Sequence, residues 1–412
     1  MPANQFLALD VGSANIKAAV GEIKKDNKLS LFSLFKMPSR GMRKGMVDDA
    51  VEVSSAINQT FNEIKKHHKD VHRKIYLNIG SAHARSQVSR GIVAVSRADY
   101  EIYQDDIARV VQASQAINLP PNRMIINAIN QEYIVDGVGE IKDPLGMVGN
   151  RLEVNSLIID AFSPAVKNIM KCIETVGGSI KELSFGPYAT SYSILSKNQK
   201  DLGVVMVDIG FGTTAMSVYE DGKLIDLAVF PVGSGHITND LAIGLKVSIE
   251  AAEAVKLSFG AALSKDIPSR EIIDLKKIDP RARNTVSKKF IAEIIEMRLV
   301  EIMEFVNNEL KRINKAGKLP AGVVLAGGGA KLSGIIDLVK QELKLPAQIG
   351  IPDLSLMDLP NGELAIKAED PESACVIGLL MLAAEKNSVN RSANWQNIYN
   401  GYFKKWLDYL MP

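Results

Sequence analysis

The sequence predicts an α/β fold of two related lobes, with an inserted α+β subdomain and an amphipathic helix at the C-terminal end. Three observations support this prediction. The segments LALDVGSANIKAAVGE and VMVDIGFGTTAMSVYE align without a gap, which indicates a duplication. Residues 85–161, which lie between these two segments, have a different pattern of predicted strands and helices. Aromatic side chains gather on one side of a helix built from residues 394–411.

Composition narrows the class of protein. At roughly 150 residues per domain, 412 residues suggest two or three domains. The net charge of +2 gives no support for a nucleic-acid binder. Cys172 and Cys375 are too few for a disulfide framework and fit a reducing cytosol. We expect no signal peptide in MPANQFLALD, and the longest apolar run, residues 374–384, is about half the length of a spanning helix.

The first lobe is expected from residues 1–84 together with 162–202. Strands are predicted at FLALDV, IKAAVGEI, LSLFSLF and KIYLNIG, because each is a short apolar run next to turn residues. A helix is predicted near residues 49–68, since Val53, Ile57, Phe61 and Ile64 recur at helical spacing. Two further helices follow, near residues 164–176 and at GPYATSYSIL.

The inserted unit, residues 85–161, has about 75 residues, which is enough to predict a small subdomain. RGIVAVS predicts a strand, and DDIARVVQASQ predicts a helix with an acidic first turn. MIINAI, EYIVDG and RLEVNSLIIDA predict three more strands.

The second lobe is expected from residues 203–236 together with 320–386. Its strands are predicted in GVVMVDIG, TTAMSVYE and KLIDLAVF, with a turn at Asp221-Gly222. Residues 237–319 are charged and mainly helical in pattern, and residues 387–393 are polar enough to predict a linker before the final segment, residues 394–412.

Each related hairpin carries an aspartate that is followed by a glycine two residues later, as Asp10-Val11-Gly12 and Asp208-Ile209-Gly210. Glycine lets backbone N–H groups approach an anion, so two such turns could grip phosphates from both sides. The aspartates would need a bridging Mg²⁺ with its waters, and Lys17 would add positive charge. An ordinary Asx turn at each strand end is the alternative.

A glycine-rich turn, Gly327-Gly328-Gly329, lies between a predicted strand and a predicted helix. Such a turn exposes its backbone to a flat ligand or a phosphate, although a tight strand–helix connection would look the same. Leu332 stands where the dinucleotide fingerprint has its third glycine, and no P-loop pattern occurs in the sequence.

The final segment, residues 394–412, has its apolar side chains within an arc of about 140° on a helix. They are Trp395, Ile398, Tyr399, Tyr402, Phe403, Trp406, Tyr409 and Leu410. Trp and Tyr favour the membrane–water interface, so we expect a surface-bound helix, with packing on the core or on a partner as the alternative. Burial of these side chains in the membrane would contribute ~8 kcal/mol, from which the cost of ordering the helix must be subtracted. We therefore expect one chain to bind the membrane reversibly and a polymer of many chains to bind it strongly.

The order of hairpin, insertion, second hairpin, helical region and glycine turn resembles the actin-like ATPase superfamily. Within it, the chain resembles the FtsA family of bacterial cell division. The stretches that carry this resemblance are SRGMRKGMVDD, IKDPLGMVGNRLEV, GHITNDLAIGL, EAAEAVKLSFGAAL, IAEIIEMRLVEI and AGGGAKLSGI. The resemblance implies an actin-like fold of two ribonuclease H-like lobes that binds ATP with Mg²⁺.

The resemblance also implies residue roles. The first phosphate loop would hold Asp10, Gly12 and Lys17, and Glu253 with Lys256 would lie near the ribose, unless they are only a surface ion pair. The second phosphate loop would hold Asp208, Gly210, Gly212, Thr213 and Thr214. Residues 327–329 would form the adenosine motif, and Gly235 would belong to another anion-facing turn.

The second loop departs from the family pattern, because Phe211 and Ala215 replace a glycine and an aspartate. The loss of a carboxylate that could position water predicts slow or no ATP hydrolysis.

In this family the implied function is to polymerise and to tether the FtsZ ring to the inner membrane, on its cytoplasmic face at the division site. The insertion would serve self-association, and residues 237–319 would receive the FtsZ C-terminal tail; other division proteins are further expected partners. Arg298 resembles a contact position for FtsZ, although a salt bridge to Glu301 or a neighbour explains it equally well. The rival interpretations are a PilM-like type IV pilus assembly protein and a sugar-kinase phosphotransferase, for which no catalytic aspartate motif is visible.

Overall fold

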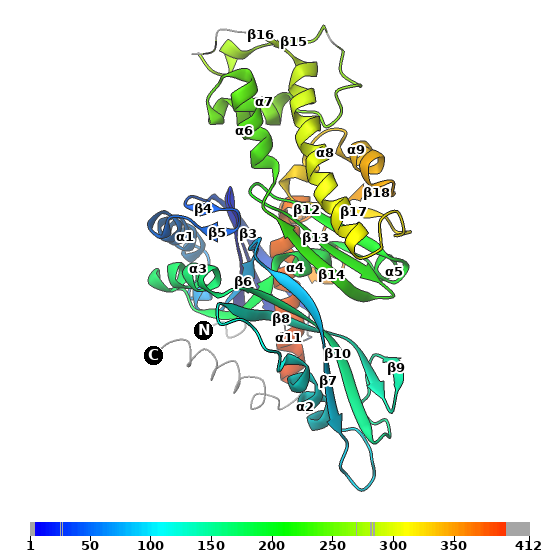
Figure 1. The fold of residues 1–412 in the computed structure, drawn as a ribbon. Coiled ribbons are helices and arrows are strands. Elements are labelled where there is room, and N and C mark those ends of the chain that lie inside the picture. Colours follow the sequence, from blue (N-terminus) through cyan, green and yellow to red (C-terminus); the bar gives the residue numbers. More distant parts are fainter. Residues whose placement is uncertain are drawn as a thin grey trace.

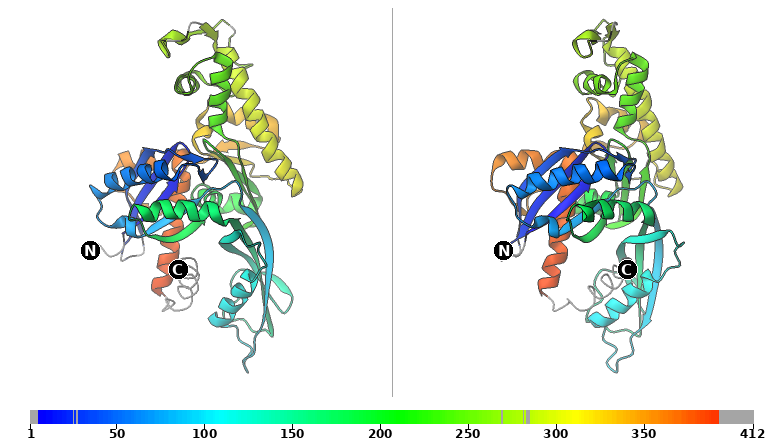
Figure 2. Two further views of the ribbon diagram at one scale, coloured as in Figure 1. Left: turned by 60° about the vertical axis from the view of Figure 1, so that its left-hand side comes forward. Right: turned by 90° about the vertical axis from the view of Figure 1, so that its left-hand side faces the viewer.

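The computed structural model describes residues 5–392, except residues 25, 27, 269, 281, 283 and 284. It has two lobes, a helical region above the second lobe and an insertion that projects from the opposite end (Figures 1 and 2). The first lobe is built on a six-stranded sheet. Its strands, in spatial order, are β11 (Ile180–Phe185), β6 (Ile75–Ile79), β1 (Gln5–Val11), β2 (Asn15–Ile23), β3 (Leu29–Pro38) and β19 (Met357–Asp358).

Helices cover both faces of this sheet. They are α1 (Ala50–Lys65) and α3 (Ser163–Thr175) on one face, and α4 (Gly186–Ile194) and α11 (Ala374–Ser392) on the other. Successive side chains of a strand point to opposite faces, so Leu7 and Leu9 pack toward α1 and α3, whereas Phe6 and Ala8 pack toward α4 and α11. All four side chains are buried, which explains why the opening of the chain is a nearly continuous apolar run.

The second lobe repeats the topology of the first. Its strands are β14 (Lys223–Phe230), β13 (Thr214–Glu220), β12 (Val204–Ile209), β17 (Val323–Ala326) and β18 (Ala347–Ile349), in this spatial order. The order matches β3-β2-β1-β6-β11 strand for strand. Asp10 lies opposite Lys17 in the first hairpin, and Asp208 lies opposite Ala215 in the second. The predicted duplication is therefore confirmed.

The region above the second lobe is mainly helical, as expected. Its elements are α6 (Ser234–Leu245), α7 (Ile249–Phe259), β15 (Ile272–Asp274), η2 (Leu275–Lys277), β16 (Thr285–Ser287) and α8 (Lys288–Arg312). Helix α8 buries Ile291, Ile295, Leu299 and Ile302 at spacings of three and four, so one side of the helix joins the core. Helix α9 (Ile335–Leu343) packs into the same core.

The insertion forms a four-stranded antiparallel sheet with one helix. Its elements are β7 (Arg85–Ala94), α2 (Gln104–Gln115), β8 (Arg123–Val135), β9 (Val138–Ile141) and β10 (Arg151–Phe162). β8 is one strand where two were expected, because the polar residues at its centre find partners. Asn130 Nδ2 donates to Tyr133 Oη at 2.9 Å, and Gln131 Nε2 donates to the Leu224 carbonyl of the second lobe at 2.6 Å.

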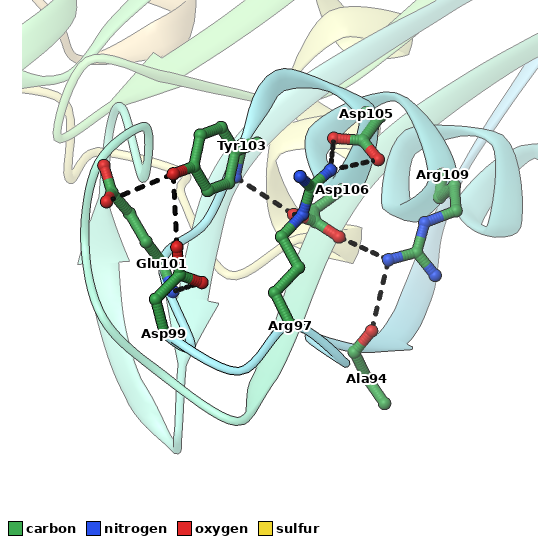
Figure 3. Close-up of polar contacts among 8 residues, drawn as sticks. All are labelled: Ala94, Arg97, Asp99, Glu101, Tyr103, Asp105, Asp106 and Arg109. Carbon is green, nitrogen blue, oxygen red and sulfur yellow. Dashed lines mark hydrogen bonds and ion pairs between the residues drawn. The ribbon is translucent and has the colours of Figure 1, made fainter.

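Charged side chains fix the loop between β7 and α2 (Figure 3). The carboxylate of Asp106 is buried, accepts the backbone N–H of Tyr103 at 3.0 Å and pairs with Arg109. Arg97 donates to both oxygens of Asp105 at 2.6 Å and stacks over the Tyr103 ring at 4.3 Å. The loop is therefore held in one conformation at the start of α2.

The last part of the described chain returns to the first lobe, so the assignment of residues 320–386 to the second lobe is wrong for its C-terminal half. β19 pairs with β3, and side chains of α10 (Gly362–Ala368) and α11 join the first-lobe core. The apolar sequence of α11 indicates a buried helix without indicating which sheet it covers.

Helix α11 continues to Ser392, so residues 387–392 are helical turns and not the expected linker. Asn387 Nδ2 donates to Tyr76 Oη at 2.7 Å, which ties this end to the lobe. The predicted amphipathic helix, residues 394–412, lies outside the described residues. Across the described ranges, no helix is both long and apolar enough to span a bilayer.

Candidate functional site

Two matching turns face each other where the lobes meet. In the first, the backbone N–H of Gly12 donates to the Asn15 carbonyl at 3.0 Å. In the second, Gly210 donates to the Thr213 carbonyl at 2.9 Å. A Cβ atom at Gly12 would lie 2.9 Å from the Asn15 carbonyl oxygen, and one at Gly210 would lie 2.9 Å from the Thr213 carbonyl oxygen. Both turns therefore need glycine, because a side chain would meet the backbone of the turn.

The backbone of these turns is available to an anion. Among the described residues, the N–H groups of Ser13, Ala14, Phe211 and Gly212 have no hydrogen-bond partner. The turns also touch, because a Cβ atom at Gly212 would lie 2.6 Å from Ser13 Oγ. Backbone N–H groups that converge from two lobes can enclose a phosphate.

A cavity of about 660 Å³ opens between these turns, which is within the range of small-molecule sites. Most of the predicted nucleotide-binding residues line it, namely Asp10, Gly12, Lys17, Asp208, Gly210, Gly212, Thr213, Glu253, Lys256, Gly327, Gly328 and Gly329. Gly327 has a φ of 79°, and a Cβ atom there would lie 2.3 Å from Asp208 Oδ1. Residue 327 must therefore be glycine for the turn to pack against Asp208.

Three carboxylates of the cavity lining act on the ammonium of Lys17. Lys17 Nζ lies 3.6 Å from Asp10 Oδ2. Burial alone would lower the pKa of Lys17, but Asp10, Glu372 and Asp208 together raise it. Burial raises the pKa of Asp208 to about 6; Lys17 opposes this rise and Asp10 adds to it. The cavity thus disfavours an uncompensated second carboxylate.

These residues fit a hydrated Mg²⁺. Mg²⁺ keeps several waters and takes one or two carboxylates with phosphate oxygens, and Asp10 and Asp208 both line the cavity, one from each lobe. In the described part of the chain, no cluster of three or more His, Cys, Asp or Glu side chains could hold a metal ion unaided. Phosphates and water would therefore complete the coordination.

Glu253 and Lys256 form an ion pair of 2.6 Å on α7, and both line the cavity. Lys256 Nζ also donates to Thr238 Oγ1 at 2.8 Å and lies 5.6 Å from the Phe211 ring centre. Burial lowers the pKa of Lys256, and Glu253 opposes that effect. The pair is therefore part of the cavity wall and not a solvated surface bridge.

Three predicted residues lie elsewhere. Thr214 is fully buried in β13, and Gly235 packs beneath the Phe211 ring, where a Cβ atom would lie 2.7 Å from the ring; neither lines the cavity. Arg298 lies on α8, far along the chain from the turns, and pairs with Asp240 at 2.6 Å and with Glu301. The predicted membrane-facing residues of the tail fall outside the described residues.

Sequence reasoning did not predict the side chains that hydrogen-bond to the two aspartates, namely Asn78, which lines the cavity, and Thr190, which is buried behind it. Asn78 Nδ2 donates to Asp10 Oδ1 at 2.6 Å, and Thr190 Oγ1 donates to Asp208 Oδ2 at 3.2 Å. The signal for Asn78 was its place at the end of β6, which runs parallel to β1 and so ends at the same sheet edge. Thr190, inside α4, carries no comparable signal.

Glu372 and Cys375 also line the cavity. Glu372 pairs with Lys36 of β3 at 2.8 Å and lies 3.8 Å from Lys331 in the short helix η3 (Gly328–Lys331). Burial, then Asp10 and Asp208, raise the pKa of the Cys375 thiol. Their segment was assigned to the wrong lobe, which hid their position.

Family comparisons agree with this architecture. Residues 205–378 match the family model described as Cell division protein FtsA, and residues 81–160 match the SHS2 domain inserted in FTSA. The second match coincides with the insertion from β7 to β10. The chain is 34% identical to cell division protein FtsA of Neisseria meningitidis over 378 residues, 92% of this chain and 89% of that one. It is 33% identical to that of Bacillus subtilis, over 92% and 83% of the two chains.

Two solved structures share the fold. A chain of the PilM-PilN type IV pilus biogenesis complex has a TM-score of 0.64 at 18% identity, over 92% of this chain and 98% of that one. MreB5 of Spiroplasma citri bound to ADP has a TM-score of 0.54 at 14% identity, over 95% and 99%. At such identities the likeness shows the actin-like fold alone.

With relatives above 30% identity over 92% of its length, and with the insertion that the family model describes, the chain belongs to the FtsA family of actin-like cell-division proteins.

Proposed function

We propose that this chain binds ATP with Mg²⁺ between its lobes and, as a polymer, tethers the FtsZ ring to the inner membrane during division. The observation that carries the nucleotide part is the pair of matching aspartate–glycine turns that close one cavity from both sides. Membership of the FtsA family supports the division role.

In the cavity, the free N–H groups at Ser13 and Gly212 would receive phosphate oxygens, and Lys17 would add a positive charge. Asp10 and Asp208 would hold Mg²⁺ through water, and the ion would neutralise phosphate charge there. The glycine turn at residues 327–329 would lie beneath the nucleoside, with the Glu253–Lys256 pair beside the ribose.

Hydrolysis is proposed to be slow. Ala215 lies opposite Asp208 and lines the cavity, where a carboxylate could otherwise orient an attacking water. No residue is therefore assigned a catalytic role, and the nucleotide acts as a structural ligand that holds the lobes together.

The region of residues 237–319 is proposed to receive the FtsZ C-terminal tail. Ile243 of α6 is 77% exposed and Met297 of α8 is 67% exposed, and apolar side chains with this exposure suit a peptide contact. Arg298, beside Met297, is pre-positioned by Asp240 and Glu301, and its side chain stays partly exposed.

The insertion is proposed to mediate self-association. Tyr100, Leu145, Met147 and Val148 are exposed apolar residues on two adjoining loops. The loops are joined by the hydrogen bond from the Ile102 N–H to the Met147 carbonyl at 2.8 Å. The network in Figure 3 holds this surface in place, which lowers the entropic cost of assembly.

The membrane part rests on the sequence of residues 394–412. Liposome co-sedimentation of the full chain, with and without Mg·ATP, tests it. A chain that ends at Ser392 should lose pelleting and keep nucleotide binding. Trp406→Ala should weaken pelleting, whereas the matched change on the predicted polar side of the helix, Asn397→Ala, should not. Unchanged pelleting of the truncated chain would contradict the proposal.

The rival functions are less supported. The PilM-like interpretation has a structural match at 18% identity, against 34% to an FtsA protein, and the latter decides the family. A phosphotransferase would consume ATP with an added sugar, so a coupled ATP-consumption assay separates that interpretation from ours.

A further inference from the structure

A short hairpin in the stretch SRGMRKGMVDD has no role in the site described so far. It consists of β4 (Met42–Arg43) and β5 (Met46–Val47), joined by Lys44 and Gly45. Both turn residues have positive φ, 50° and 73°, as a two-residue type I′ turn requires. Its base is fixed to α1, because the Gly41 carbonyl accepts the N–H groups of residues 48 and 49 at 2.8 and 3.0 Å.

The hairpin reaches both lobes at the cavity. Gly45 lines the cavity and packs on the first lobe, where an added Cβ atom would lie 2.2 Å from the Gly80 carbonyl. On the other side, a Cβ atom at Gly212 would lie 3.3 Å from the Lys44 backbone nitrogen and 2.6 Å from Ser13 Oγ. The Lys44–Gly45 turn therefore packs between Gly80 of the first lobe and Gly212 of the second phosphate-type turn, and Gly212 in turn approaches Ser13 of the first.

Lys44 is a cation near this point for which the described residues supply no ion pair. The lysines that line the cavity have carboxylate partners: Lys17 with Asp10, Lys36 with Glu372, Lys256 with Glu253, and Lys331 with Asp370. Lys44 is only half-buried, and within the described ranges no carboxylate lies within 4 Å of its ammonium. The backbone N–H groups of Lys44 and Gly45 likewise lack partners among the described residues.

We propose that the Lys44–Gly45 turn binds the terminal phosphate of the nucleotide and so distinguishes a triphosphate from a diphosphate. This inference rests on the proposed nucleotide binding. The glycine turn at Gly327, which is proposed to lie beneath the nucleoside, contacts Asp208, so the nucleoside would lie on that side of the aspartates. The hairpin instead lies against Gly212, at the point where the second turn approaches Ser13 of the first. The phosphate that lies deepest between the two turns is therefore the one nearest Lys44. A diphosphate leaves Lys44 without a partner.

The test is calorimetric titration of the full chain with Mg·ATP, a non-hydrolysable ATP analogue and Mg·ADP. Lys44→Ala should weaken both triphosphates by about 10- to 100-fold, the usual worth of a charge-assisted contact, and should leave ADP within about two-fold. Lys65→Ala is the matched control, because Lys65 is also half-buried without an ion pair but lies at the far end of α1. It should change neither affinity.

Two further variants guard against a folding defect. Lys44→Gln keeps the aliphatic stem and should show the same triphosphate-selective loss, whereas Lys44→Arg should retain most of the preference. Equal weakening of ATP and ADP, or no change in either, overturns the inference and leaves nucleotide binding intact. A wild-type chain that binds neither nucleotide overturns the proposed function and this inference with it.

Discussion

Asp208 carries an electrostatic cost that a neutral side chain removes. Burial raises its pKa from the ordinary 3.8 to about 6, which at 1.36 kcal/mol per pH unit corresponds to about 3 kcal/mol. The native state holds this proton more tightly than the unfolded chain does. Stability is therefore lost as the pH rises from about 4 to about 6, and the full cost persists above pH 6.

We predict that Asp208→Asn stabilises the ligand-free protein. The free energy of unfolding, from urea titrations followed by circular dichroism, should rise by up to about 3 kcal/mol at pH 8 and by roughly 1.5 kcal/mol at pH 5. Asp337→Asn on α9 is the matched control, because that side chain is 70% exposed, and it should change stability little at either pH.

The same variant should respond poorly to Mg·ATP. Ligand binding stabilises the native state in proportion to the logarithm of the ligand concentration over Kd, and Asp208→Asn lacks one of the two proposed Mg²⁺ carboxylates. A variant that is no more stable than the wild type at pH 8, or a gain that is equal at pH 5 and pH 8, would refute the electrostatic reasoning.

Three further predictions follow from the site and its surroundings. Ala215→Asp should raise phosphate release by at least about ten-fold in a colorimetric assay, because it restores a carboxylate that can orient water; an unchanged rate would contradict this reason for slow hydrolysis. Arg298→Ala should weaken binding of an FtsZ C-terminal peptide in fluorescence anisotropy, and should cost about 1 kcal/mol of stability through the lost Asp240 pair; a stability loss alone would mean that Arg298 is only structural. Gly327→Val should abolish nucleotide binding, since even a Cβ atom meets Asp208 at 2.3 Å, and retained affinity would place the nucleotide elsewhere.

Local features of the fold could be predicted from the sequence. The duplication was visible because Asp10 and Asp208 precede glycines at the same spacing within strands of similar apolar content. The structure places Asp10 opposite Lys17 and Asp208 opposite Ala215, which are equivalent positions in the two hairpins. The helix with Val53, Ile57 and Phe61 on one side begins at Ala50, because Asp49 accepts the N–H groups of residues 51 and 52.

Long-range packing could not be predicted in the same way. Helix α11 is apolar on most sides, so its sequence does not indicate which lobe it joins, and Glu372 and Cys375 were therefore not expected at the cavity. Asn78 and Thr190 are single polar residues, and their role becomes visible only when the structure places them beside Asp10 and Asp208. Gly235 resembled part of an anion-binding turn, but the Phe211 ring covers it.

The attachment of α11 to the first lobe has a mechanical consequence. Helix α11, which ends at Ser392, belongs to the first lobe, whereas α6 and α8 pack with the second lobe (Figure 1). A force between the tail and those helices must pass from one lobe to the other, through ion pairs such as Lys331–Asp370 and through the hydrogen bond from Gln131 of the insertion to the Leu224 carbonyl. A nucleotide clamped between the lobes would share that load, so its departure would weaken the proposed linkage between membrane and ring.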